Sequence, residues 1–522
     1  MTFNANATCR RVHILVCLLC AVVLTGCGTL PSLEGRTRSS ALDISAARAT
    51  ALGQAIAPQA DAHPGKSGIW PLPRARDAFA IRALLAQAAQ RTLDVQYYIW
   101  HGDLTGTLLL EALHNAADRG VRVRLLLDDN GTSGLDAELM ALESHPNIEV
   151  RLFNPFMTRS PKWLGYITDF SRANRRMHNK SFTADNQATI IGGRNIGDEY
   201  FGAAEGVLFE DLDVLAVGPV VNDVSTDFDR YWASESAYPV GLVLPAVSPA
   251  QIDALSAKAA DVERDSKAQA YLGALREMTS IQTLLRGELD LEWTTTRMVS
   301  DDPAKGLKAI GKRGLLIYQL GDILGAPTRD VELVSPYFVP MAAGVDMFSE
   351  LVARGVKVRV LTNALESSDV AAVHAGYAKR RKPLLEAGVI LYETRRTMPE
   401  GKRNESAGPF GSSGSSLHAK TFSVDGSRVF IGSFNFDPRS ANLNTELGFV
   451  IDSPTLARAI ETAFDTTVPA SAYQVLLDEA GKLYWIEQTG NGTVRYDTEP
   501  GVGFWKRAGV SFLSLLPIEW ML

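Results

Sequence analysis

Two short segments of the chain carry the same pattern of chemically active side chains. Each contains a histidine, a lysine two residues later and an aspartate five residues after the lysine. In a 522-residue chain with eight histidines, chance would give fewer than ~0.1 matches to this spacing. The repetition therefore indicates a functional site. The two sets are His178, Lys180 and Asp185, and His418, Lys420 and Asp425.

The spacing also predicts where these side chains point. A histidine and a lysine at positions i and i+2 of a strand share one face, so imidazole and ammonium converge on one pocket. Each aspartate is an odd number of residues away, which favours a structural role at the following turn. After the turn, a glycine or serine and an asparagine return to the histidine, where amides can approach an anion. These residues are Gly193 and Asn195 in the first segment, and Ser433 and Asn435 in the second.

The elements that must position these residues also occur twice. Helical spacing of apolar residues is followed by a buried strand at 93–100, a second helix and an alternating strand at 121–127. The second half repeats this order, with strands at 331–337 and 356–360. Strands that alternate with amphipathic helices predict an α/β sandwich in each half. We expect a fused pseudo-dimer whose equivalent loops meet at one site that could hold a phosphodiester.

The expected organisation has six parts. Residues 1–26 are a signal peptide, and 27–65 are a tether rich in Ala, Ser, Pro and Gly. The first repeat covers 66–240, connecting helices and a strand cover 241–310, and the second repeat covers 311–470. Residues 471–522 form an apolar C-terminal extension, in which 504–516 favour an interfacial helix over simple core packing.

The first residues predict export and lipidation. Two arginines precede an apolar run at 12–24, which is too short to cross a bilayer comfortably. The run ends in Leu-Thr-Gly before Cys27, which resembles the lipobox of a bacterial lipoprotein, in which the cysteine is acylated. Gly28 stands where aspartate would signal inner-membrane retention, so we expect a lipid anchor on the periplasmic side, with the outer membrane favoured. The alternatives are an ordinary secretory signal or a short anchor with an incidental cysteine.

Composition excludes several kinds of chemistry. All four cysteines lie within residues 1–27, so the processed body has no disulfide, thiolate nucleophile or cysteine-zinc site. The net charge of −7 gives no general attraction for nucleic acid, and phosphate must be held by local positive charge. The histidines outside the repeated pattern include His101, His114 and His145, which we interpret as structural.

With these motifs the sequence resembles the phospholipase D superfamily, whose signature is two His-x-Lys-x4-Asp motifs, over roughly residues 65–470. Within the superfamily it is similar to bacterial cardiolipin synthases of the C type, through stretches at 94–100, 373–377 and 515–522. The resemblance implies a metal-independent enzyme, without a cofactor, that forms a covalent phosphohistidine. It also implies transfer of a phosphatidyl group to the hydroxyl of phosphatidylglycerol, with phosphatidylethanolamine as a further candidate lipid.

The resemblance also implies a role for each signature residue. In related enzymes the N-terminal histidine is the nucleophile, so His178 would attack phosphorus and His418 would act as acid and base. The family uses a carboxylate to orient each histidine. Glu446 has the expected spacing in the second half, whereas the first half departs from the pattern and offers Asp211. The phosphoryl oxygens would be held by Lys180, Lys420, Asn195 and Asn435.

Other functions remain open at this point. The same site could hydrolyse phospholipids or other phosphodiesters, because water and a lipid hydroxyl would use the same histidines. A nuclease is disfavoured by the acidic charge and the lipid anchor, and a non-catalytic surface lipoprotein by two intact motifs. We expect phospholipid and membrane partners and no nucleic acid, and the sequence indicates no obligatory protein partner.

Overall fold

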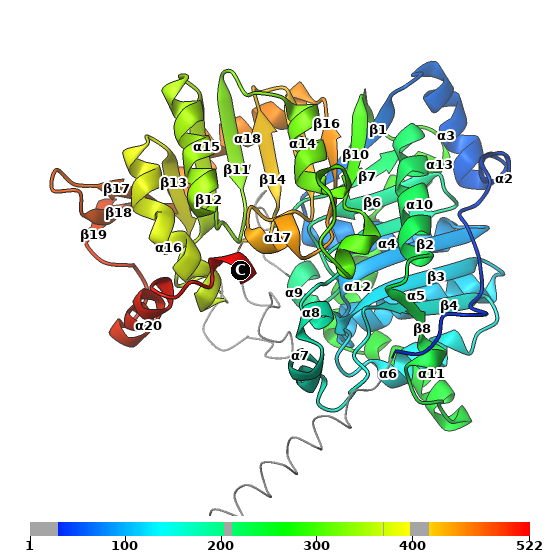
Figure 1. The fold of residues 1–522 in the computed structure, drawn as a ribbon. Helices are drawn as coiled ribbons and strands as arrows, with labels where there is room; N and C mark the ends of the chain where they lie inside the picture. The colour runs from blue at the N-terminus through cyan, green and yellow to red at the C-terminus, as the bar shows by residue number, and fades with distance from the viewer. Residues whose placement is uncertain (1–29, 203–210, 369, 397–416) are drawn as a thin grey trace, which may run out of the picture.

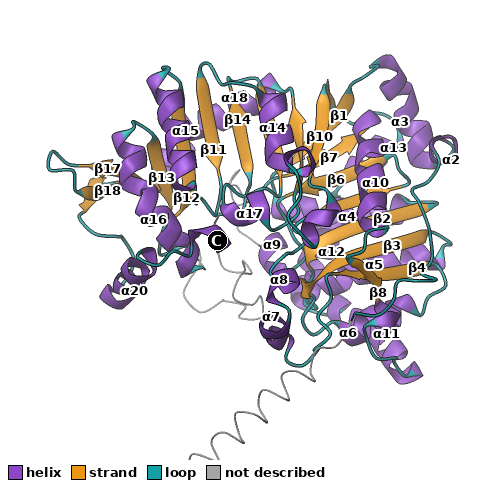
Figure 2. Ribbon diagram, viewed as in Figure 1, coloured by secondary structure: helices purple, strands orange, loops and turns teal. Residues whose placement is uncertain are grey.

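The computed structural model describes residues 30–202, 211–368, 370–396 and 417–522. It contains two mixed β-sheets side by side, each with helices packed on its faces (Figure 1; Figure 2). Within the described residues the first sheet has nine strands and the second has ten. The predicted pair of α/β halves is therefore confirmed.

The first sheet has the order β8-β4-β3-β2-β5-β6-β7-β1-β9. Its parallel core is β2, β3 and β4, and β5 joins β2 antiparallel and continues through a hairpin into β6. Its strands are β1 (Ser67–Leu72), β2 (Thr92–Ile99), β3 (Arg122–Gly131), β4 (Ile148–Phe153), β5 (Ser181–Ala184), β6 (Ala188–Gly192), β7 (Asp213–Val217), β8 (Ala237–Pro239) and β9 (Glu292–Thr294).

The second sheet repeats this arrangement. Its order is β10-β16-β15-β14-β11-β12-β13-β17-β18-β19, so β11, β12 and β13 correspond to β2, β3 and β4, and the β14–β15 hairpin to β5–β6. Its strands are β10 (Thr296–Ser300), β11 (Asp330–Val334), β12 (Lys357–Asn363), β13 (Ile390–Thr394), β14 (Thr421–Val424), β15 (Arg428–Gly432), β16 (Leu447–Ile451), β17 (Ala472–Leu477), β18 (Leu483–Thr489) and β19 (Gly492–Tyr496).

Helices cover both sheets, and their apolar faces supply much of the two main cores. The helices of the first half and the connection are α2 (Ile44–Arg48), α3 (Ala51–Ala62), α4 (Ala75–Ala88), α5 (Leu104–Asp118), α6 (Asp136–Glu143), α7 (Gly165–Thr168), α8 (Phe170–Ala173), α9 (Asp198–Phe201), α10 (Pro219–Trp232), α11 (Pro249–Glu263), α12 (Ser266–Glu277) and α13 (Ser280–Leu285). Those of the second half are α14 (Leu316–Leu324), α15 (Met341–Ala353), α16 (Ala371–Glu386), α17 (Pro438–Asn442), α18 (Pro454–Asp465), α19 (Thr467–Ser471) and α20 (Phe504–Ser514).

The two halves meet through a core of their own. Apolar residues of β6 and β7 lie against those of β15 and β16, for example Ile191 and Val214 with Val429 and Phe449. The connection passes directly from one sheet to the other, because β9 pairs with β1 and β10 pairs with β16. This buried contact brings the ends of the two hairpins together.

Two expectations about local structure need correction. Residues 44–62 belong to helices α2 and α3 rather than to a tether, because Thr50 caps α3 and its side chains Leu52 and Ile56 are buried in the first core. The connection contains helices and strand as expected, and strand β9 joins the first sheet. The C-terminal extension is not only apolar helix, because β17, β18 and β19 extend the second sheet.

No helix among the described residues is long and apolar enough to cross a membrane.

Candidate active site

The two repeated motifs meet where the halves touch. His178 and Lys180 lie just before β5, and His418 and Lys420 lie just before β14. The backbone of the first motif is held by the second half, because the amide of His178 donates to the carbonyl oxygen of Thr445 at 2.9 Å. All four catalytic candidates are buried. The structure therefore brings the two predicted sets into one site.

The carboxylates that orient the histidines cross between the halves. Nδ1 of His178 lies 2.8 Å from Oε2 of Glu446, and Nδ1 of His418 lies 2.6 Å from Oδ2 of Asp211. Each histidine is thus braced by a carboxylate from the opposite half. The sequence singled out both carboxylates but not this crossed pairing. A carboxylate at Nδ1 fixes the imidazole and leaves Nε2 to react.

The surroundings of Glu446 differ from those of Asp211. Serine hydroxyl groups donate to both oxygens of Glu446, from Ser433 to Oε2 and from Ser440 to Oε1 at 2.7 Å. Oδ1 of Asp211 accepts instead from the backbone amide of Leu212 at 2.8 Å. A Cβ at Gly193 would lie only 2.1 Å from this same Oδ1. Gly193 therefore makes room for Asp211, and Ser433 donates to Glu446. Both residues were expected to bind phosphate, and in the structure both serve the orienting carboxylates.

The two lysines and Asn195 supply donors around the histidines. Nζ of Lys180 donates to the carbonyl oxygen of His178 at 2.6 Å, and Lys420 makes the equivalent bond to His418. Oδ1 of Asn195 accepts from the amide of Ile99 at 3.2 Å, whereas its buried Nδ2 has no hydrogen-bond partner within the described residues. A buried donor without a partner is costly. It is suited to a phosphoryl oxygen of a bound substrate.

Burial and nearby positive charge lower the pKa values of both histidines. Burial, Lys180 and Lys420 hold the pKa of His178 well below its usual value. Burial and Lys420 lower the pKa of His418 to about 3, although Asp211 opposes this. The charges of Lys180 and Lys420 thus act on both histidines. An anionic phosphodiester between the lysines would offset their charge and raise both pKa values.

The two orienting carboxyl groups have opposite shifts. Burial raises the pKa of Glu446 to about 7, although Lys180 and the two serine hydroxyls act against this. The pKa of Asp211 lies below its ordinary value, because the interactions with His418, Arg194 and Lys420 outweigh the effect of burial. Asp211 therefore stays ionised beside His418, which favours a proton on that histidine. The pKa of Glu446 therefore lies close to neutral pH.

The aspartates of the two motifs act on the fold. The carboxylate of Asp185 accepts from three backbone amides at 90–92, at 2.7–2.9 Å, and ties the β5–β6 turn to the start of β2. Asp425 binds the amides at 328–330 in the same way. Both aspartates have positive φ, with Asn186 and Gly426 following, as a hairpin with two left-handed residues requires. Although they belong to the catalytic signature, they lie at the far end of the hairpin from the histidines, as their odd spacing predicted.

Three residues of the site were missed by sequence reasoning. The rings of Tyr98 and Tyr200 stand edge-on to His178 and His418, with centroids 4.9 and 5.2 Å apart. Arg439 is buried, and its charge acts on both Tyr98 and His178. The repeat gave no signal for Arg439, because the equivalent position in the first half, four residues after Asn195, is Glu199.

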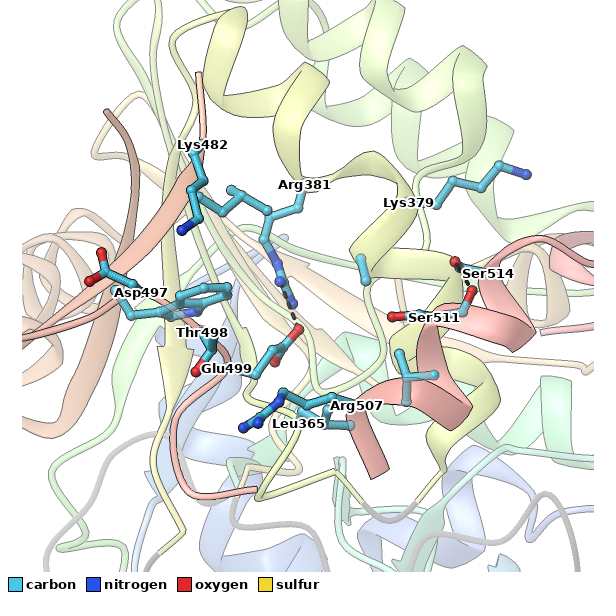
Figure 3. A pocket seen from close by; sticks show the side chains of 14 residues that line it. Leu365, Lys379, Arg381, Lys482, Asp497, Thr498, Glu499, Arg507, Ser511 and Ser514 are labelled. Atoms are coloured by element: carbon cyan, nitrogen blue, oxygen red, sulfur yellow. Dashed lines mark hydrogen bonds and ion pairs between the residues drawn. The ribbon is translucent and has the colours of Figure 1, made fainter. Parts of the chain in front are cut away.

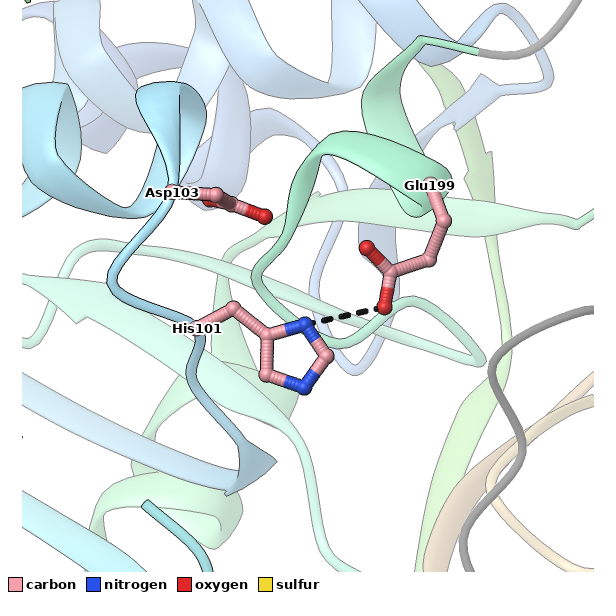
Figure 4. Close-up of side chains that lie close together, drawn as sticks. All are labelled: His101, Asp103 and Glu199. Atoms are coloured by element: carbon pink, nitrogen blue, oxygen red, sulfur yellow. Dashed lines mark ion pairs between the residues drawn. The ribbon is translucent and has the colours of Figure 1, made fainter. Parts of the chain in front are cut away.

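His101, Asp103 and Glu199, the residue before Tyr200 in the chain, lie close together (Figure 4). Nδ1 of His101 lies 3.0 Å from Oε1 of Glu199, and one ligand atom of each of the three residues falls within 4.8 Å of the others. Both oxygens of Asp103 are already engaged, by the amides of Gly106 and Asp198 at 3.0 and 2.7 Å. Asp103 thus caps α5 and joins it to α9. These contacts make the cluster a structural support for α9, whose Tyr200 contacts His418.

Comparisons with known proteins agree with this geometry. The family model described as "Cardiolipin synthase, PLD-like domain" matches residues 81–232 and 320–468. Cardiolipin synthase C of Escherichia coli is 51% identical over 90% of this chain and 99% of its own length. An uncharacterized protein of Helicobacter pylori strain 26695 is 30% identical over 90% of this chain and 92% of its own. The crystal structure of phosphatidylserine synthase from Haemophilus influenzae covers 90% of this chain and all of its own, with a TM-score of 0.54 and 12% identity, and shares the fold.

Proposed function

Because the chain belongs to the cardiolipin synthase family of phospholipase D-like proteins, we propose that it makes cardiolipin. It transfers a phosphatidyl group from one phospholipid to the hydroxyl of phosphatidylglycerol. The observation that carries the proposal is the crossed bracing of His178 by Glu446 and His418 by Asp211. Two histidines held in this way provide a nucleophile and an acid/base at one phosphorus atom.

In the first step Nε2 of His178 attacks phosphorus. Oε2 of Glu446 accepts a hydrogen bond from Nδ1 of His178, so that the Nε2 lone pair faces the substrate. As the P–O bond to the leaving alcohol breaks, the alkoxide takes a proton from His418, whose positive charge is stabilised by Asp211. Lys180 and Lys420 offset the negative charge on the phosphoryl oxygens. The products are a free alcohol and a phosphatidyl group on His178.

The second step reverses the first with a new alcohol. His418, now neutral, removes the proton from the acceptor hydroxyl as its oxygen attacks phosphorus. The P–N bond to His178 breaks, and the lone pair returns to Nε2. When the acceptor is phosphatidylglycerol the product is cardiolipin, and when it is water the product is phosphatidic acid. An acceptor lipid held in the bilayer plane beside the intermediate competes with water through its high effective concentration.

The test is purified protein on liposomes of phosphatidylglycerol, alone and mixed with phosphatidylethanolamine, with both lipid products measured. We expect cardiolipin to exceed phosphatidic acid, and His178→Ala to abolish both. Phosphatidic acid as the main product at every phosphatidylglycerol fraction would replace the synthase with a phospholipase D-type hydrolase. Cleavage of DNA without either lipid product would make the protein a nuclease.

Anchoring to the cell envelope is part of the proposal. Cys27 lies outside the described residues, and its acylation rests on the lipobox-like sequence that precedes it. A lipoprotein cysteine carries several acyl chains, which anchor a protein stably. Metabolic labelling with palmitate should mark the wild-type protein and not Cys27→Ser, which should keep its leader. A Cys27→Ser variant with normal mass and normal label would refute the anchor.

A further inference from the structure

Large apolar side chains are exposed in two segments outside the catalytic machinery. Five of the eight tryptophans are buried or half-buried, and the three exposed ones all belong to these segments. The most exposed are Trp505 and Leu515, at 84% and 80%. We refer to the whole set as the apolar surface. It comprises Trp163, Ile167 and Phe170 from 162–173, and Phe504, Trp505, Phe512, Leu515 and Trp520 from 504–521.

The C-terminal part of this surface is one face of helix α20. At 100° per residue, Phe504, Trp505, Phe512 and Leu515 fall within an arc of about 100°. The opposite face is anchored by Val510, which is 5% exposed and packs with Leu365 and Ala375. Helix α20 lies at the lower edge of the molecule, outside both sheets (Figure 1). Its apolar face is therefore turned away from the protein.

Contacts through Arg439 tie both segments to the catalytic site. Its guanidinium donates to the carbonyl oxygen of Asn174, at the end of α8, at 3.0 Å. Nε of the same side chain donates to the carbonyl oxygen of Met521 at 3.2 Å, next to Trp520. Arg439 also acts electrostatically on His178. The backbone at the ends of both segments is thus linked to a buried residue of the site.

A cationic cavity lies behind α20. It has a volume of about 440 Å³ and is walled by α16, β18 and the inner face of α20 (Figure 3). Four of its lining residues are cationic and two are anionic, and Arg381 is paired with Glu499 at 2.8 Å. Lys482 and Arg507 make no ion pair with any described residue. The local charge is therefore positive on a protein whose net charge is negative.

We propose that the apolar surface docks on an anionic phospholipid bilayer and turns the site toward the lipids. Tryptophan and phenylalanine partition into the interfacial layer of a bilayer, and nearby cations are attracted to anionic headgroups. The inference rests on the proposed function, because both substrates of a phosphatidyl transfer are bilayer lipids. Docking lets a lipid reach His178 without leaving the membrane entirely.

The first test measures insertion of α20 directly in the full-length protein. Vesicles contain phosphatidylglycerol and phosphatidylcholine with brominated acyl chains, which quench nearby tryptophans. The part of the emission that is absent from Trp505→Phe should be quenched when vesicles are added. If brominated vesicles leave this Trp505 emission unchanged, the proposal is overturned, whatever the N-terminal anchor contributes.

The second test separates docking from catalysis. Phe504→Ser/Phe512→Ser should lower the rate of lipid transfer on vesicles by roughly tenfold or more. The rate on lipid dispersed in detergent micelles should stay at the wild-type value. The matched control is Tyr318→Ser/Met347→Ser on α14 and α15, where both side chains are 42% exposed. It should change neither rate, and equal losses in the two pairs would contradict the proposal.

Charge and alternative occupants are tested with the same material. Lys482→Gln should reduce the preference for phosphatidylglycerol vesicles over pure phosphatidylcholine by roughly fivefold. If the Phe504→Ser/Phe512→Ser variant instead sediments as a monomer where the wild type sediments as a dimer, the apolar surface is an interface with a second copy of the chain and not with a bilayer. Quenching of Trp505 without any cardiolipin formation would leave docking intact and refute the proposed function alone.

Discussion

Replacing Asp211 with asparagine should nearly abolish transfer, and the structure indicates why. Oδ1 of Asp211 accepts from the backbone amide of Leu212 at 2.8 Å, whereas Oδ2 accepts from His418. In Asp211→Asn the amide oxygen must keep the bond to Leu212, because an NH₂ group there would oppose another donor. The NH₂ group then faces Nδ1 of His418. That nitrogen becomes an acceptor, and the proton is forced onto Nε2.

A neutral His418 with its proton on Nε2 is a poor acid and cannot serve as the base. Loss of the aspartate charge also removes the interaction that opposes the lowered pKa of His418. In a histidine–aspartate pair of this kind, the wrong tautomer costs about 10⁴ in kcat. We therefore expect a loss of roughly 10³–10⁴-fold in the rate of cardiolipin formation.

The assay is cardiolipin formation from phosphatidylglycerol in mixed micelles, which removes any contribution from bilayer docking. Glu446→Gln is the matched comparison. Its neighbours Ser433 and Ser440 are hydroxyl groups that can donate or accept, so the amide can still turn its oxygen toward His178. That variant should lose only about 10–10²-fold. An Asp211→Asn enzyme within tenfold of wild type would refute the role of Asp211 in bracing the acid/base.

Further predictions concern pH, packing, the turn and metals. Protonation of Glu446 removes the carboxylate charge that orients His178 through Nδ1, so kcat/KM should fall as the pH drops below about 7, the pKa of Glu446; a flat profile between pH 5 and 8 would contradict this, and Glu446→Gln should shift the pH at which kcat/KM falls. Gly193→Ala should cost roughly 10²-fold in kcat with little change in KM, because its Cβ would lie 2.1 Å from Oδ1 of Asp211; near-normal kcat would show that the carboxylate can move without harm. Asp185→Asn places an amide donor opposite the amide of Gln90, so the free energy of unfolding in urea should fall by about 1–3 kcal/mol while kcat stays unchanged; unchanged stability would remove its structural role. Activity should survive EDTA; complete loss of activity in EDTA that a divalent cation restores would contradict the metal-free mechanism.

Much of the fold could be predicted because local patterns carry it. Alternating valines and leucines fix β3 and β12, and the odd spacing of Asp185 and Asp425 places them in turns. The helical segment at 44–62 was missed because its buried contacts are few, Leu52 and Ile56 among alanines. Composition alone is a poor guide to such a segment, since small residues suit both a linker and a close-packed helix.

The candidate site was predicted in content but not in connectivity. His178 and Glu446 are separated by 268 positions, and His418 and Asp211 by 207. No local spacing specifies which carboxylate serves which histidine, because the pairing depends on how the two halves dock. The role of Gly193 was also hidden, since a glycine near an anion site suits phosphate binding as well as a close carboxylate. The pseudo-twofold relation between the halves is the only signal in the sequence that bears on the crossing.

The central claim is that His178 carries the phosphatidyl group and His418 moves the protons. It is tested most directly with a phosphatidyl ester of p-nitrophenol, a leaving group that needs no acid. In His418→Asn the first step should proceed and the second should stall, because no base activates the acceptor. Mass spectrometry of peptides from the alkaline-quenched enzyme should then find the phosphatidyl group on His178, while His178→Asn stays unlabelled. A phosphatidyl group on His418 in the His178→Asn enzyme, with none on His178 in His418→Asn, would contradict the account.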